Sequence, residues 1–253
     1  MRILAVARNT FREAVRDKVL YVLLFFAAVA VFGSKALGWI SIGQDLKIVK
    51  DICLASTSVF GALIAIFVGT SLVYKEIDKR TLYTILSQPM HRYEFILGKY
   101  FGLAGLIAVV VLTMTGVSSA YVLLLGGALE KVYFLALLLI FWKLLLVTAF
   151  ALLMSSLSSP ILGAVIVFCG YVFGHATGVF LDLPPQFDGA VAKQLLEIAY
   201  YVLPNLGNFD LRAEAANGVP VSAAYVAYVL VYGTAYTAVL LTLAAVAFEN
   251  KDV

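Results

Sequence analysis

Six long apolar stretches, separated by short polar segments, dominate the pattern of the chain. Each is long enough for a helix that crosses the hydrocarbon core of a membrane, which takes about 20 residues. Because unpaired backbone amides are costly in hydrocarbon, each stretch is predicted to be an α-helix. The predicted spans are residues 19–40, 52–74, 99–126, 132–156, 160–181 and 223–248.

The first 18 residues follow a different pattern, that of an amphipathic helix. Apolar residues recur on one side, and Arg8, Arg12 and Arg16 fall on the other. A basic face above an apolar stripe is typical of a helix that lies in the headgroup layer. We therefore predict an interfacial helix over residues 1–18. It either only orients the first span or also presents its charged face to a cytoplasmic partner.

The composition excludes an ordinary soluble domain. Hydrophobic residues make up 63% of the 253 residues and charged residues 13%, and the mean hydropathy is +1.00. A soluble domain has about 45–50% apolar and about 25% charged residues. Since a core of this size cannot absorb the excess, the lipid bilayer must solvate the rest. The predicted fold class is an all-α integral membrane protein with one domain, residues 1–253.

The lysines and arginines are distributed unevenly between the two sides of the membrane. An even number of spans places both termini on the same side. That side carries eleven of the 18 basic residues and the opposite side six. Because basic residues concentrate in cytoplasmic segments, we predict a multi-pass protein of the cytoplasmic membrane with both termini in the cytoplasm.

The cytoplasmic connection over residues 75–98 is long, yet it is neither polar nor low in complexity. Glu76 and Arg80 stand four residues apart, so the second helix is predicted to continue past the membrane surface. A short helix follows and ends at Pro89, because the residue before a proline is steered away from helical angles. Its apolar face packs either on the chain's own N-terminal helix or on another protein. The face comprises Leu82, Ile85 and Leu86.

Four segments carry a combined signature: residues 10–18, 76–99, 155–160 and 201–206. The second contains Glu76-x-x-x-Arg80-Thr81, Leu86-Ser87-x-Pro89 and Arg92-x-Glu94-Phe95. Together the segments resemble the type 2 ABC transporter permeases. In particular, they are similar to the branch that includes the permease of the copper-processing system for nitrous oxide reductase.

This resemblance implies a type V exporter-like half-transporter that pairs with a second permease copy or homologue. Its short cytoplasmic coupling helix would dock on a separate P-loop ATPase subunit, which would bind ATP and Mg²⁺, while this chain would bind no cofactor. The implied function is to couple ATP hydrolysis to translocation, with export as the family tendency. The alternative is a membrane scaffold or assembly factor that docks the ATPase without a transported solute. The implied ATPase interface is Glu76, Arg80, Thr81, Leu82, Ile85, Leu86, Pro89, Arg92 and Tyr93.

Motifs of catalysis are missing from the sequence. It contains no GxxxxGK[ST] phosphate loop, no HExxH and no GxSxG. We therefore predict no catalytic residues, no metal site and no nucleic-acid partner, and we place ATP hydrolysis on the partner subunit. An intramembrane enzyme would need convergent ionisable side chains, and Lys143 and His175 are too few.

Polar or small residues inside two predicted spans need an explanation. A lysine at the centre of a span, such as Lys143, costs about 2.5–3.5 kcal/mol on insertion scales. It faces either a cavity or carboxylate in the pathway, or a hydroxyl of a neighbouring span. His175 is either a packing residue or a ligand. A glycine ridge beside it serves packing within the subunit or a dimer or gate contact. The ridge comprises Gly170, Gly174 and Gly178.

The loop over residues 182–222 lies on the outer side in this topology. A loop of this length usually has structure of its own. Family resemblance implies partly re-entrant helices that close the outer end of the pathway, and the sequence alone is equally compatible with a surface helix.

Overall fold

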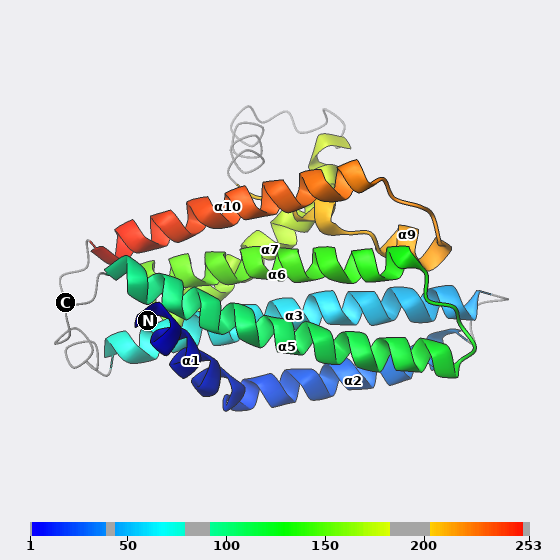
Figure 1. Cartoon of the computed structure of the whole chain (residues 1–253), viewed down its shortest axis with the longest axis horizontal. Coiled ribbons are helices and arrows are strands. Elements are labelled where there is room, and N and C mark those ends of the chain that lie inside the picture. The colour runs from blue at the N-terminus through cyan, green and yellow to red at the C-terminus, as the bar shows by residue number, and fades with distance from the viewer. Residues whose placement is uncertain (1, 39–43, 79–91, 183–202, 250–253) are drawn as a thin grey trace, which may run out of the picture.

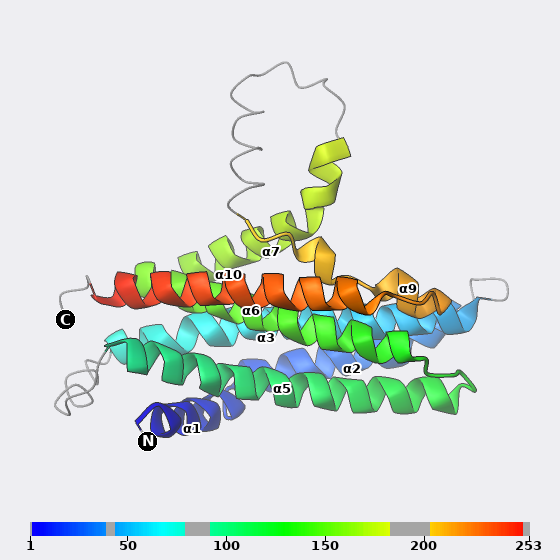
Figure 2. The same ribbon diagram turned by 45° about the horizontal axis from the view of Figure 1, so that its top comes forward.

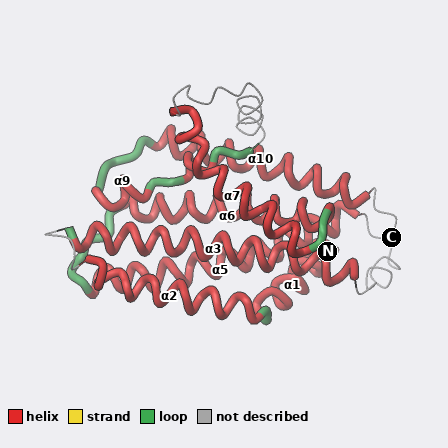
Figure 3. The backbone as a smooth tube through the Cα atoms, turned by 180° about the vertical axis from the view of Figure 1, so that it is seen from behind, coloured by secondary structure: helices red, strands yellow, loops and turns green. Residues whose placement is uncertain are grey.

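The computed structural model describes residues 2–38, 44–78, 92–182 and 203–249, and every regular element in these ranges is helical (Figure 3). The all-α fold class is therefore confirmed. The elements are α1 (Arg2–Val15), α2 (Lys18–Gly38), α3 (Asp45–Asp78), α5 (Arg92–Leu124), α6 (Lys131–Leu157), α7 (Pro160–Asp182), the 3₁₀ helix η1 (Leu206–Phe209), α9 (Arg212–Asn217) and α10 (Ala223–Glu249).

Five helices in the described ranges are long and apolar enough to cross a membrane: α2, α3, α5, α6 and α10. The remaining predicted span, residues 160–181, falls on α7, which has 23 residues and is apolar over Pro160–Ala176. The structure thus shows a multi-pass membrane protein, and the count of six spans stays a prediction.

Two helices extend beyond the spans expected from hydropathy. α3 begins at Asp45 instead of near residue 52, so Lys47 and Lys50 lie in its first turns and not in a loop. Hydropathy misses this part because its charged residues lower the average, although helix geometry continues through them. α5 begins at Arg92 instead of near residue 99.

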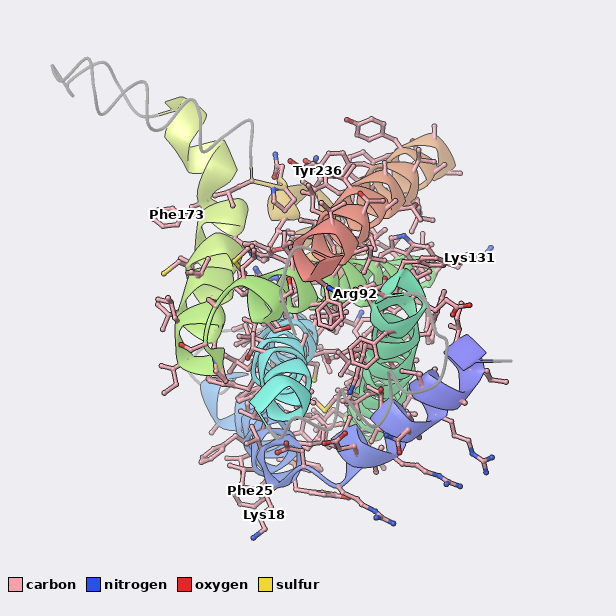
Figure 4. All side chains as sticks on the ribbon, turned by 90° about the vertical axis from the view of Figure 1, so that its left-hand side faces the viewer. Lys18, Phe25, Arg92, Lys131, Phe173 and Tyr236 are labelled. Carbon is pink, nitrogen blue, oxygen red and sulfur yellow. The ribbon has the colours of Figure 1, made fainter. Side chains whose placement is uncertain are left out.

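The helices form an elongated bundle with α6 in its interior (Figure 1). α10 and α3 pack along α6, and α5 and α7 also contact it. α2 lies along α3 at the edge of the bundle. The outer surface is apolar as well: Phe25 of α2 and Phe173 of α7 point away from the bundle and are 64% and 47% exposed (Figure 4). A protein that is apolar both inside and outside is solvated by lipid.

α1 has the predicted amphipathic character, but part of its apolar stripe packs on protein instead of facing lipid. Thr10 and Ala14 are buried, whereas the three predicted arginines, Arg8, Arg12 and Arg16, are exposed. The partner is α5, on which glycines leave room for the α1 backbone. A Cβ atom on Gly102 would lie 2.6 Å from the carbonyl oxygen of Ala7.

The described part of the loop between α7 and α10, from Leu203 onward, packs against the long helices. η1 contacts α6 and α7, and α9 contacts α3 and α6. Phe209 is fully buried there, which fixes η1 in the bundle. The last turns of α7 lean away from the other helices (Figure 2). Residues 183–202, the first part of the loop for which partly re-entrant helices were predicted, lie outside the described residues, and re-entry stays a prediction.

Candidate polar site inside the helix bundle

Three helices bring polar side chains together around Lys143 of α6. The lysine is only 1% exposed. Its Nζ donates a hydrogen bond to Oγ of Ser58, on α3, at 2.6 Å. Nζ also lies 3.2 Å from Nε2 of His175, on α7. Of the two readings of Lys143, the hydroxyl of a neighbouring helix is therefore observed, and His175 is a second partner.

The contacts of His175 determine its tautomer. Nδ1 lies 3.0 Å from the backbone carbonyl oxygen of Tyr171, one turn earlier on α7. A carbonyl oxygen only accepts, so Nδ1 carries the proton and donates. Nε2 is then the unprotonated nitrogen of a neutral imidazole and accepts from Lys143. A second proton on His175 would place two cations 3.2 Å apart.

Tyr171 closes the group. Its hydroxyl lies 3.3 Å from Oγ of Ser58, and its ring centroid lies 4.5 Å from that of His175. Residues four apart on a helix share one face, which is why Tyr171 and His175 both reach α3 and α6. We call Ser58, Lys143, Tyr171 and His175 the Lys143 cluster. It holds one cation with three neutral partners.

An ion pair lies between the cluster and the outer side. Nε and Nη2 of Arg212 bind the two carboxylate oxygens of Asp210 at 2.9 and 2.7 Å. Partial burial raises the pKa of Asp210, but the hydrogen bonds and charge of Arg212, together with the charge of Lys143, lower it by more, so it lies below its ordinary value. Asp210 raises the pKa of Arg212 against the opposing effect of burial, and Asp51 of α3 adds to it.

Residues 203–222, which the predicted topology places on the outer side, are called the outer segment below. This segment is held against α7 and α10 next to the Lys143 cluster. A Cβ atom on Gly174 would lie 2.8 Å from the carbonyl oxygen of Pro204, so glycine allows the close approach. The backbone N–H of Asn205 donates to the hydroxyl of Tyr232 at 2.9 Å. The Tyr225 hydroxyl donates to the carbonyl oxygen of Asn208, also at 2.9 Å. The outer segment therefore covers the bundle beside His175.

The glycine ridge of α7 serves contacts within the chain at two of its three positions. Gly174 faces the outer segment, and a Cβ atom on Gly170 would lie 2.6 Å from the Phe150 ring of α6. Gly178 lies in the last turns of α7, where the surroundings are outside the described residues. Of the two readings of the ridge, packing within the subunit is the one observed at Gly170 and Gly174.

The predicted ATPase interface is only partly described. Nη1 of Arg92 donates to the carbonyl oxygen of Phe248 at 3.0 Å, which joins the start of α5 to the end of α10 (Figure 4). Tyr93 is 51% exposed. Glu76 lies near the end of α3, and its side chain is outside the described residues. The remaining predicted interface residues lie wholly outside them: Arg80, Thr81, Leu82, Ile85, Leu86 and Pro89.

Sequence reasoning found two members of the cluster and missed the other two. Lys143 and His175 stand out because ionisable residues are rare in spans. Ser58 and Tyr171 do not stand out, since hydroxyl-bearing residues are common in this chain and their role depends on which helices meet. In the described part of the chain, no group of three His, Cys, Asp or Glu residues could hold a metal ion.

These features define the class of protein as an all-helical, multi-pass membrane protein. The chain matches the family described as ABC-2 family transporter protein over residues 4–253, and it belongs to that family. It is thus the permease, the membrane subunit of an ATP-binding cassette transporter, and ATP is hydrolysed on a separate subunit. A search of curated proteins found no match.

Proposed function

We propose that this permease is one half of a dimeric, exporter-like transporter with six spans, formed by α2, α3, α5, α6, α7 and α10, and with both termini in the cytoplasm. The family match over nearly the whole chain carries the proposal. The apolar character and length of α7 support the sixth span. The excess of basic residues at the end that holds α1 and the start of α5 supports the orientation.

The cytoplasmic connection over residues 75–98 is proposed to pass movement of the ATPase into the membrane domain through α5 and α10. Arg92 supports this, because its bond to the Phe248 carbonyl joins the two helices at the cytoplasmic end. A cation at the last turn of a helix also interacts favourably with the helix dipole. A displacement of the connection would therefore move the start of α5 and the end of α10 together.

The copper-processing branch rests on sequence motifs alone, and the described helices contain no group of metal ligands that adds to it. Export as the direction rests on family resemblance.

Affinity purification from native membranes in mild detergent, with mass spectrometry of co-eluting proteins, tests the proposed function. We expect a P-loop ATPase with the wild type and its loss in the double variant Leu86→Asp, Arg92→Glu. Lys131→Glu, a charge reversal at the opposite end of the bundle, is the matched control and should retain the ATPase. If an intact wild-type chain brings down no P-loop ATPase, the proposed docking is refuted, and with it the scaffold alternative, which docks the same ATPase.

A further inference from the structure

The exposed side of α1 carries a row of arginines. Side chains four residues apart on a helix point in nearly the same direction, because each step of four turns the chain by about 40° beyond a full turn and advances it by about 6 Å. Arg8, Arg12 and Arg16 therefore form one row about 12 Å long. All three side chains are exposed, and we call them the α1 arginine row.

The charge of the α1 arginine row is not neutralised within the part of the chain that the structure describes. None of its three guanidinium groups forms an ion pair there. The carboxylate of Asp17 accepts a hydrogen bond from the backbone N–H of Val19 at 3.0 Å, at the start of α2. Over residues 8–18, with Lys18 included, four cations face two carboxylates, which leaves an excess of two positive charges.

The seating of α1 directs this row sideways. A free amphipathic helix sinks its apolar side into the membrane and raises its basic side toward water. Here the apolar side packs on α5, where Thr10 and Ala14 are fully buried, so the basic side points away from the bundle. Viewed along the long axis of the bundle, α1 lies at its edge and not over the ends of the other helices (Figure 4). The row therefore faces the neighbouring lipids.

Apolar side chains that face lipid border the row at both ends. Leu4, one turn before Arg8, is 75% exposed. At the other end, Lys18 and Phe25 of α2 both point away from the bundle (Figure 4). Cations next to lipid-facing apolar side chains are typical of the level at which the headgroups meet the hydrocarbon.

A hollow of about 700 Å³ lies against the second half of α1, and its volume falls in the range of small-molecule sites, about 300–1,000 Å³. Its described wall combines cationic, polar and apolar groups with one carboxylate: Asn9, Phe11, Arg12, Glu13, Val15 and Arg16. The guanidinium groups of Arg12 and Arg16 present forks of N–H donors that match the oxygens of a phosphate. Phe11 and Val15 add apolar surface for the part of a lipid next to its phosphate.

We propose that the outward side of α1 is a binding site for anionic lipids. The phosphate of the headgroup accepts hydrogen bonds from Arg12 and Arg16 in the hollow, and Arg8 extends the attraction along the row. The sideways direction of the row favours lipid over an acidic protein surface, which would approach from the cytoplasmic end. The site goes beyond the proposed function, because it concerns the lipid beside the subunit and not the transported molecule.

The charge of the membrane is complementary to this site. The cytoplasmic leaflet has a negative surface potential, and it attracts basic segments next to a span. The choice of leaflet follows from the proposed orientation of the chain. Binding itself does not depend on that orientation, so it can be measured in a membrane with the same lipids on both sides.

Photo-crosslinking of the purified full chain in nanodiscs tests this site. The discs consist of phosphatidylcholine with a small fraction of phosphatidylglycerol that carries a diazirine near the glycerol end of one chain. Mass spectrometry of chymotryptic peptides maps the label, since chymotrypsin does not cleave at arginine. We expect label on α1 and on the first turn of α2. Unlabelled phosphatidylglycerol should displace it, whereas inorganic phosphate in the buffer should not.

A second probe isolates the role of net charge. Phosphatidylcholine with the same diazirine has the phosphate but no net charge, so it should label α1 much less than the phosphatidylglycerol probe. This comparison uses the wild-type chain and stands whatever the variants do.

Variants of the row measure its contribution. The triple change Arg8→Gln, Arg12→Gln, Arg16→Gln should weaken labelling by the phosphatidylglycerol probe about hundredfold, at roughly fivefold for each cation near an anionic surface. Glutamine is a good helix former, so α1 should stay helical. The corresponding triple change to lysine should restore labelling, because it restores the charge.

The matched control removes three exposed cations at the opposite end of the bundle: Lys35→Gln, Lys47→Gln and Lys131→Gln. It should label on α1 like the wild type. The inference is overturned if the triple glutamine variant of the row labels like this control. It is also overturned if the two probes label α1 equally. Normal labelling of the triple glutamine variant together with loss of its ATPase would assign the row to a cytoplasmic partner instead.

The inference and the proposed function can fail separately. If the ATPase co-purifies but labelling does not depend on the row, the inference fails and the proposed function stands. If labelling depends on the row but no ATPase is found, the lipid site stands and the proposed function fails.

Discussion

The contact between α1 and α5 can be tested with a single methyl group. In Gly102→Ala, the new Cβ atom would lie 2.6 Å both from the carbonyl oxygen of Ala7 and from Cβ of Thr10. Neither neighbour is the end of a flexible side chain, so α1 must move away. Overpacking of this kind costs about 1–3 kcal/mol. Alanine also favours a helix over glycine by about 1 kcal/mol, which partly hides this cost.

Gly116→Ala on the same helix removes that ambiguity, because a Cβ atom there meets nothing within 4 Å. The gain in helix propensity is common to both variants, so their difference isolates the clash. We expect Gly102→Ala to be less stable than Gly116→Ala by about 1–3 kcal/mol, at roughly 2–4 °C per kcal/mol for a chain of this length.

The melting temperatures of both variants in the same detergent, measured by size-exclusion chromatography of heated samples, give this difference. A cysteine at position 10 gives a direct readout of where α1 lies. Thr10 is fully buried. A cysteine introduced there, Thr10→Cys, should therefore resist a water-soluble maleimide in a chain that also carries Gly116→Ala. In a chain that also carries Gly102→Ala, the same cysteine should react. Cys169, which is exposed, is first changed to alanine. Equal melting temperatures and equal protection in the two backgrounds would refute the packing of α1 on α5.

Two further predictions concern the outer segment, and limited proteolysis is the measurement for both. Tyr232→Phe removes the acceptor of the Asn205 N–H, a loss of about 1–3 kcal/mol if the donor stays unpaired, so cleavage near Asn205 should increase while membrane insertion is unchanged. The pKa of Asp210 is lowered in the folded chain from its ordinary value of 3.8. Its pairing with Arg212 therefore stabilises the outer segment fully at pH values above 3.8, and this stabilisation is lost as the pH falls through the lower pKa of the folded chain. Protection should thus be constant from about pH 5 to 8 and fall only in stronger acid, and a fall near neutral pH would contradict it.

The long helices could be predicted from the sequence because hydropathy over about 20 residues integrates many side chains. The start of α3 at Asp45 could not, since Lys47, Lys50 and Asp51 reduce the average hydropathy over turns in which the helix nevertheless continues. The seating of α1 was also hidden. Its amphipathic stripe could be recognised in the sequence. An apolar stripe can pack equally well on lipid or on the glycines of α5, however, and only the folded structure shows that these glycines lie next to α1.

The Lys143 cluster could also be predicted only in part from the sequence. An ionisable residue in a span identifies itself, so the sequence pointed to Lys143 and to His175. It gave two kinds of partner for the lysine and no means to choose between them, because the choice depends on which turn of α3 lies opposite. Ser58 does so, with its hydroxyl 2.6 Å from Nζ.

The position of the cluster has a consequence for transport. Lys143 bonds to α3 through Ser58 and to α7 through His175, so the second of these contacts persists only while α7 stays in place beside α6. Gly174, the neighbour of His175 on α7, packs against the outer segment. A shift of α7 would therefore break the contact between Lys143 and His175 and loosen the outer segment in one movement.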